Sequence, residues 1–389
     1  MFVKQKSSAE HQSLAGFYFF YFASIGAFLP YWNLYLRHLE FSARQIGELS
    51  AVLLATKIFA PYIWGWVADH TGKRLSAIRL ASFVGMVIFA AALVLKGYWS
   101  LLIILAGFSF FWNATLPQFE AATMNNLGDS KHMYSRIRLW GSVGFIVTAS
   151  LLAPALEKFG IQHLPWVILV ILLFTWMNTL LVNETPPSLH KIARPSMLKT
   201  CLQPQVFALL LACFLIQASH GPYYTFFSIY AEDNGYSRTL IGQLWSLGVL
   251  AEVVVFYFMY RWLPRFGAKL LLVVAMMLTV VRWWLIAYYV EYLSILLFAQ
   301  LLHAASYGLF HASAIHLIDK YFSGSIQGRG QALFASISFG LGGSLGSLVS
   351  GYTWNSIGPS YVYLLAMCIA LLALIQYLWI VKPRFTSLT

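Results

Sequence analysis

Charged residues are scarce in this chain: aspartate, glutamate, lysine and arginine make up 10% of its 389 residues, whereas an ordinary soluble domain has about a quarter. So little polar surface would not cover a globule in water, which excludes an ordinary soluble protein. Apolar residues make up 60% of the chain, in continuous rather than alternating runs. This pattern predicts membrane-spanning helices in a lipid bilayer and disfavours a β-barrel.

Cysteine is also scarce. Cys201, Cys213 and Cys368 show neither paired nor metal-ligand spacing, so we expect no disulfide framework, no metal site and no cofactor. The basic N-terminal segment 1–12 is not followed by a short apolar core with a cleavage site, so no signal peptide is expected. In a membrane protein the placement of cations matters more than the net charge of +12, and we expect no nucleic-acid partner.

The apolar runs predict an all-α integral membrane protein. The twelve predicted spans cover residues 13–36, 44–67, 75–95, 99–124, 138–156, 164–183, 204–230, 239–262, 268–289, 292–318, 327–351 and 360–381. The longest polar connection divides six spans from six. It gives an N-terminal six-helix bundle over 1–183, a cytoplasmic linker over 184–203 and a C-terminal six-helix bundle over 204–389.

The distribution of cations predicts the orientation. If the N-terminus lies inside, most of the 25 lysines and arginines fall in inside segments. The positive-inside rule then places both termini in the cytoplasm. We therefore expect a multi-pass protein of the inner (cytoplasmic) membrane.

The two halves contain an internal repeat. "FSARQIGEL" at 41–49 matches "YSRTLIGQL" at 236–244 with an offset of 195, and the same offset pairs Gly72 with Gly267. Internal repeats of this kind are typical of transporter folds.

The phrase "GWVADHTGKR", 65–74, interrupts the apolar sequence after span 2. It resembles the loop signature of the major facilitator superfamily. Gly72 permits a tight turn. We expect Asp69 either to accept from a neighbouring helix N-terminus or to pair with an arginine, for which Arg136 or Arg138 at the start of span 5 is the favoured partner. These contacts would latch the cytoplasmic side in one conformation. The predicted latch comprises Gly65, Asp69, Gly72, Lys73, Arg74 and Arg136.

A closer resemblance covers nearly the whole chain. "PQFEAA" (117–122) and "SRIRLWGSVGF" (135–145) resemble the matching helices of lactose-permease-type proton symporters, which implies a pair between Glu120 and Arg138. Phe145 stands where those permeases have a sugar-stacking tryptophan, a departure that disfavours sugar. "RLWGSV" (138–143), "GYSRTLIGQLWSLGVLAEV" (235–253), "VVRW" (280–283), His303 and His311 resemble the 3-phenylpropionate (hydrocinnamate) permease branch. The resemblance implies two pseudo-symmetric bundles in a monomer.

Ionisable side chains inside spans are functional candidates because burying them in lipid is costly. Lys57 and Glu252 are 195 residues apart, the offset of the repeat. One interpretation is a structural ion pair, or a Lys57 side chain that reaches the membrane interface. The other is that Lys57 attracts an anionic substrate group while Glu252, disfavoured as a buried anion, carries a coupling proton.

Histidines on span 10 are further candidates for proton coupling. His303, Tyr307 and His311 are spaced four apart and share a helix face. The resemblance implies that His303 belongs to a proton relay, although Ser306 stands where the lactose-permease relay has a glutamate. Glu252 with Arg282 would then take over that role. The alternative for each histidine is a hydrogen-bonded packing residue.

Two further segments carry predictions about helix geometry. In "QASHGPYYTFF", 217–227, Gly221–Pro222 should break or bend span 7, and Tyr223 and Tyr224, with Phe145, could form an aromatic wall. The glycines of "FGLGGSLGSLVSG", 339–351, predict close helix packing rather than a dinucleotide loop.

The combined prediction is a secondary transporter that works by alternating access. It couples protons to the uptake of a small organic solute, for which the resemblance favours an aromatic carboxylate such as 3-phenylpropionate. Lys57 and Arg138 would bind the carboxylate, and Glu120 would orient Arg138. The alternatives are symport of a neutral sugar or nucleoside, or export. A membrane enzyme or receptor is disfavoured because no nucleophile constellation, metal cluster or appended domain is present in the sequence.

Overall fold

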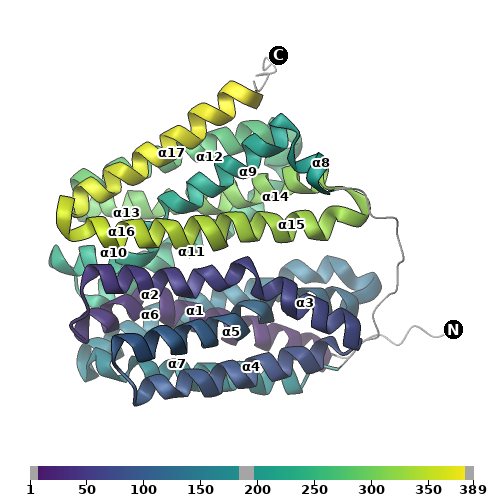
Figure 1. The fold of residues 1–389 in the computed structure, drawn as a ribbon, viewed down its shortest axis with the longest axis horizontal. Helices are drawn as coiled ribbons and strands as arrows, with labels where there is room; N and C mark the ends of the chain where they lie inside the picture. The colour runs from purple at the N-terminus through teal and green to yellow at the C-terminus, as the bar shows by residue number, and fades with distance from the viewer. Residues whose placement is uncertain (1–7, 184–196, 382–389) are drawn as a thin grey trace. The chain divides into compact units, whose positions relative to one another are not determined.

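The structure, a computed structural model, describes residues 8–183 and 197–381. Within these ranges the chain is helical and contains no strand (Figure 1). Twelve helical segments there are long and apolar enough to cross a membrane. The predicted number of spans is therefore confirmed. The α-helices are α1 (Ser8–His38), α2 (Ala43–Ala55), α3 (Ala60–Thr71), α4 (Arg74–Ala90), α5 (Tyr98–Leu127), α6 (Tyr134–Phe159), α7 (Leu164–Leu180), α8 (Met197–Cys201), α9 (Pro204–Ser219), α10 (Gly221–Asp233), α11 (Arg238–Phe266), α12 (Ala268–Tyr289), α13 (Leu293–Leu301), α14 (Phe310–Tyr321), α15 (Gln327–Ala335), α16 (Gly343–Ile357) and α17 (Pro359–Val381).

Several spans consist of two helices joined by an irregular turn. The predicted break in span 7 is confirmed, since α9 ends and α10 begins on either side of His220, with Pro222 in the first turn of α10. Span 2 is interrupted by a 3₁₀ turn, Thr56–Ile58. Spans 10 and 11 contain π-helical turns, Ala304–Leu309 and Ser336–Gly342. These three interruptions have no glycine–proline signal and were not predicted.

The chain forms two compact units. Of the described residues, the first contains 8–40, 59–183 and 237–246, and the second contains 41–58, 197–236 and 247–381. Each unit is thus built mainly from one half of the sequence, with a short segment from the other half. Most of the predicted linker 184–203 lies outside the described residues, and the predicted bundle boundaries stay a prediction.

The first unit is held together by aromatic packing between its helices. Helix α1 runs along α6 and α7, and α4 runs along α5. The rings of Phe17 and Phe119 stack with their centroids 3.6 Å apart, which joins α1 to α5. Ser150 on α6 and Ser246 on α11 share a hydrogen bond of 2.8 Å. Buried aromatic area of this kind is a large part of the packing energy of a helical core.

The second unit depends on small residues. Helix α17 lies beside α9 and α12 (Figure 1), and α16 lies against α2, α9 and α10. A Cβ atom added at Gly346 of α16 would lie 2.2 Å from the carbonyl oxygen of Ala218 on α9. Only glycine fits this approach of two backbones, so the predicted close packing in span 11 is confirmed.

The internal repeat also appears in local structure. Ser42 caps α2, because its hydroxyl accepts from the backbone N–H of Gln45 at 3.3 Å. Ser237 does the same for α11 through the N–H of Leu240 at 3.2 Å. The two matching sequence segments therefore begin helices by the same capping interaction.

Candidate functional site

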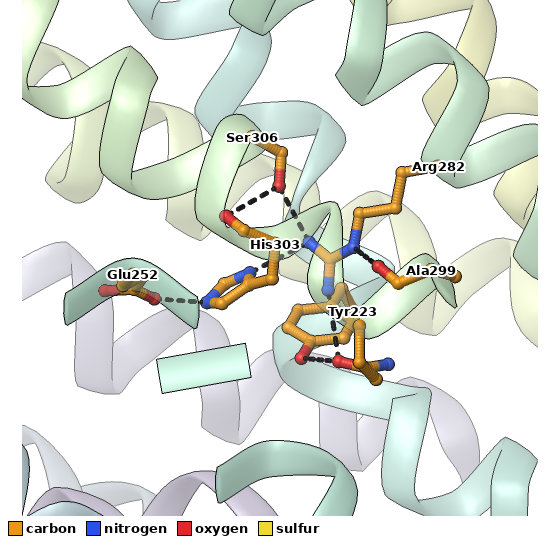
Figure 2. Close-up of polar contacts among 7 residues, drawn as sticks. Tyr223, Glu252, Arg282, Ala299, His303 and Ser306 are labelled. Atoms are coloured by element: carbon orange, nitrogen blue, oxygen red, sulfur yellow. Dashed lines mark hydrogen bonds and ion pairs between the residues drawn. The ribbon is translucent and has the colours of Figure 1, made fainter. Parts of the chain in front are cut away.

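A buried polar cluster in the second unit is centred on Arg282 of α12 (Figure 2). Its Nε donates to the carbonyl oxygen of Ala299 at 3.0 Å. Its Nη1 donates to Nδ1 of His303 at 2.9 Å and to the hydroxyl of Ser306 at 2.9 Å. Its Nη2 donates to Oε1 of Gln300 at 3.5 Å. Every one of these acceptors is uncharged, so the guanidinium is solvated by the protein without a direct ion pair among them.

Aromatic rings complete the environment of this cation. The Cζ atom of Arg282 lies 4.1 Å from the ring centroid of Tyr223 and 4.8 Å from that of Trp283. The Tyr223 hydroxyl also donates to Oε1 of Gln300 at 2.8 Å. Cation–π contacts gain strength where water is excluded, and the Arg282 side chain has no exposed surface.

The balancing anion is Glu252 of α11, which reaches the cluster through an imidazole. Its Oε1 lies 2.7 Å from Nε2 of His303. Only 8% of Glu252 and 4% of His303 is exposed. A buried charge without a partner is strongly destabilising. The Glu252–His303–Arg282 chain therefore connects one buried anion to one buried cation through a single ring.

Local sequence explains how these side chains meet. His303 and Ser306 are three residues apart and lie on one face of a helical turn, so both reach the same Arg282 nitrogen. The π-helical turn Ala304–Leu309 carries Ser306, and such turns are frequent at functional sites. A Cβ atom added at Gly248 of α11 would lie 3.1 Å from the His303 ring. The absence of a side chain at Gly248 therefore lets α11 pack closely against this ring.

From the sequence we named the ionisable members of this cluster together with Tyr223 and Ser306, but not all of its neutral members. Gln300 was not singled out, although its polar amide within an apolar span was a usable signal. Trp283 appeared in the sequence analysis only as the last residue of "VVRW" (280–283), with no role assigned to it. Its indole N–H donates to the Ser219 hydroxyl at 3.1 Å.

In the first unit the predicted contact between Glu120 of α5 and Arg138 of α6 is present. The Arg138 Nε and Glu120 Oε1 atoms are 3.7 Å apart. The Arg138 guanidinium also lies 4.0 Å from the Phe22 ring centroid. Both members of the pair are partly exposed, and its role in binding substrate stays a prediction.

Lys57 lies in the 3₁₀ turn that interrupts span 2. Its half-buried side chain makes no hydrogen bond or ion pair with any residue in 8–183 or 197–381. The interpretation that Lys57 and Glu252 form a structural ion pair is therefore wrong, because the Glu252 carboxylate is bound to His303 instead.

The residues predicted to flank the substrate ring lie in different surroundings. Phe145 is buried, with its backbone against Gly26 of α1, and one face of Tyr223 is occupied by Arg282. Tyr224 is partly exposed and stacks on His220, with ring centroids 5.6 Å apart. For all three the predicted aromatic wall stays a prediction.

His311 lies one turn beyond Tyr307 on the same helix face. The two rings stack with centroids 5.9 Å apart, and Phe334 and Phe339 surround the imidazole at 5.9 and 5.8 Å. The shared face of His303, Tyr307 and His311 is confirmed, because His303 and Tyr307 stack as well. The role of His311 in proton coupling is untested.

The predicted latch is only partly as expected. Gly72 ends α3 in the left-handed conformation with φ of 66°, which confirms the tight turn. The expected partner of Asp69 is wrong: its carboxylate accepts from Arg74 at 2.8 Å, whereas Arg138 is paired with Glu120. Arg74 lies only five residues along the chain and reaches Asp69 across the turn itself. Gly65 lies against Gln118 of α5, Lys73 precedes α4, and Arg136 is exposed.

Comparisons with known proteins agree with this architecture. The sequence model of the MFS_1 like family matches residues 11–365. The probable 3-phenylpropionic acid transporter of Escherichia coli (strain K12) is 27% identical over 90% of this chain and 93% of its own length. The maltose permease of Geobacillus stearothermophilus is 24% identical, over 95% and 94% of the two chains.

A crystal structure of a mutant of the nucleoside transporter NupG superimposes on this chain with a TM-score of 0.83. It is 18% identical and covers 95% of this chain and 99% of its own. At that identity the likeness shows the fold alone. The family match, the relatives and the twelve apolar helices lead to one conclusion: the chain belongs to the MFS_1 like family and is a multi-pass membrane transporter of the major facilitator type, not an enzyme.

Proposed function

We propose that this protein is a proton-coupled symporter of a small aromatic carboxylate of the 3-phenylpropionate class, working by alternating access in the cytoplasmic membrane. The main support is the buried Glu252–His303–Arg282 chain, because ionisable groups inside membrane spans mark proton and substrate pathways. The similarity to a probable 3-phenylpropionic acid transporter supports the cargo. We also propose that both termini lie in the cytoplasm and that the protein functions as a monomer.

In this proposal the cations attract the substrate and Glu252 carries the proton. Lys57 has no ion pair within the described ranges, so an incoming carboxylate would give it one. Arg138 is the second candidate, held by Glu120 while no substrate is bound. Tyr224 supplies aromatic surface, whereas Tyr223 holds Arg282 in place.

The proposal is tested by uptake of labelled 3-phenylpropionate into proteoliposomes with an acidic exterior. Since the undissociated acid crosses lipid unaided, the readout is the initial rate above that of empty liposomes. We expect the pH gradient to stimulate this protein-dependent rate. No stimulation, or equal stimulation in empty liposomes, would contradict proton-coupled symport of this cargo.

Replacing Lys57 with glutamine should raise the KM for the carboxylate by about 10- to 150-fold, because a charge-assisted hydrogen bond contributes roughly 1.5–3 kcal/mol. Transport of a neutral solute would not change. Lys96→Gln is the matched control, since Lys96 is exposed between helices. An unchanged KM for the carboxylate in Lys57→Gln would show that Lys57 does not bind the substrate.

A second candidate function is symport of a neutral sugar or nucleoside. Sequence similarity to a maltose permease and to the nucleoside permease NupG of Escherichia coli (strain K12) favours it. A neutral cargo gives no role to Lys57, which has no ion pair among the residues that the structure describes. The same uptake assay with labelled maltose and uridine distinguishes the two, because only the competent cargo enters above the empty-liposome rate.

A further inference from the structure

The hydrogen bonds around His303 determine where its proton lies. The Arg282 guanidinium can only donate, because it has no acceptor atom and stays charged. Its Nη1 lies 2.9 Å from Nδ1 of His303, so Nδ1 must accept and carries no hydrogen. A neutral His303 then holds its hydrogen on Nε2, which donates to Oε1 of Glu252 at 2.7 Å. Two neighbours therefore fix one tautomer.

The same contacts oppose protonation of His303. An imidazolium carries a hydrogen on both nitrogens. At Nδ1 that hydrogen would point at the Nη1–H donor of Arg282, and two cations would lie side by side in a buried site. His303 can accept a proton only if the Arg282 contact breaks. Glu252 accepts one without breaking it, since a neutral carboxyl still offers a carbonyl oxygen to Nε2–H.

The other titratable groups facing the cluster do not change this balance. Tyr223 and Tyr307 stack against the His303 ring, with centroids 5.4 and 5.7 Å away. Tyr224 packs beside Tyr223. His220, from the turn between α9 and α10, lies against Trp283, and its Nδ1 donates to the Ile216 carbonyl at 2.8 Å. Neutral tyrosines and a neutral His220 leave Arg282 and Glu252 as the charges of the cluster.

We infer that His303 is a tautomer-locked positioning residue and that Glu252 takes the coupling proton, which orders the transport cycle. This inference rests on the proposed function. With Glu252 ionised, its charge and that of Arg282 cancel. When Glu252–COO⁻ takes up one proton and becomes Glu252–COOH, the positive charge of Arg282 is no longer balanced, and binding of an organic anion becomes favourable. The proton therefore binds first, and one proton accompanies each monocarboxylate.

The inference is tested with His303→Gln, because a glutamine amide has a carbonyl to accept from Arg282 and an N–H to donate to Glu252, and does not titrate. Its turnover is expected to fall by about tenfold, the cost of imperfect hydrogen bonds. The pH gradient should stimulate its uptake by the same factor as wild type, with the same pH midpoint. His303→Phe, which can neither accept nor donate, should lose the stimulation. Loss of stimulation in His303→Gln beside a coupled wild type would overturn the inference.

Infrared difference spectroscopy on acidification provides a readout that does not depend on transport. We expect a carboxylic acid C=O band in wild type and in His303→Gln that is missing in Glu252→Gln. Imidazolium bands that disappear in His303→Gln, without that C=O band, would place the proton on His303 and overturn the inference. Because the chain has 13 aspartates and glutamates and 10 histidines, each band is assigned from the difference between wild type and a variant, and Glu252→Gln alone assigns the C=O band if His303→Gln does not fold. A wild type without acid-stimulated uptake would count against the proposed function instead.

Discussion

Replacing Glu252 with glutamine is expected to abolish the stimulation of uptake by a pH gradient while substrate exchange continues. The amide keeps an oxygen for the His303 N–H but cannot exchange a proton. It therefore mimics the protonated state, in which the charge of Arg282 is unbalanced. The measurement is the ratio of initial uptake rates with and without an acidic exterior, together with counterflow of labelled 3-phenylpropionate at equal pH.

The expected stimulation of uptake follows from the size of the pH gradient. One pH unit corresponds to about 1.4 kcal/mol, or about tenfold in distribution for a carrier that couples one proton to one anion. In Glu252→Gln this driving force is expected to have no effect on the protein-dependent rate. Glu291→Gln is the matched control, because Glu291 is exposed next to α12. If uptake by Glu252→Gln still responds to the pH gradient, Glu252 does not carry the coupling proton.

Substituting Gly346 with alanine is expected to cause a large loss of stability. The added Cβ would lie 2.2 Å from the Ala218 carbonyl oxygen and 2.9 Å from its carbonyl carbon. Both are backbone atoms, so α16 and α9 must separate. Overpacking of this kind costs roughly 1–3 kcal/mol and can cost more. The shift is measured as a lower Tm of the purified protein in detergent.

The control for this substitution is Gly328→Ala, because a Cβ at Gly328 of α15 would meet no atom within 4 Å. That variant is expected to match the wild-type Tm. Equal Tm values for Gly346→Ala and wild type would show that the two backbones do not approach as closely as described.

Much of the fold could be predicted from the sequence because hydropathy and backbone chemistry act locally. The spans follow from apolar length, and the break at His220 follows from the Gly221–Pro222 pair. The 3₁₀ turn in span 2 was not predicted, although Pro61 in the first turn of α3 is a local signal, because a proline nitrogen cannot donate to the carbonyl four residues earlier. Its tertiary contact, in which the Ser336 hydroxyl donates to the Ile58 carbonyl at 3.2 Å, has no signal in the sequence near Ile58.

The candidate site, like the fold, could be predicted from the sequence only in part. The sequence alone identified Glu252, Arg282 and His303, since charged and titratable residues are conspicuous within apolar spans. It did not identify their partners. The repeat offset suggested that Glu252 pairs with Lys57, but equal offsets mark equivalent positions in two halves rather than contacts. The Glu252 carboxylate on α11 lies 2.7 Å from His303, which stands between α13 and the π-helical turn Ala304–Leu309, because the fold brings together two segments that are distant in sequence.

The most direct test of coupled proton and carboxylate transport uses proteoliposomes that contain a pH dye, with no imposed gradient. Adding 3-phenylpropionate outside is expected to acidify the interior faster than in empty liposomes, and Glu252→Gln should remove the difference. Acidification triggered only by maltose or uridine would keep a proton symporter but contradict the carboxylate cargo. Equal rates with and without the protein for every solute would contradict proton-coupled symport itself.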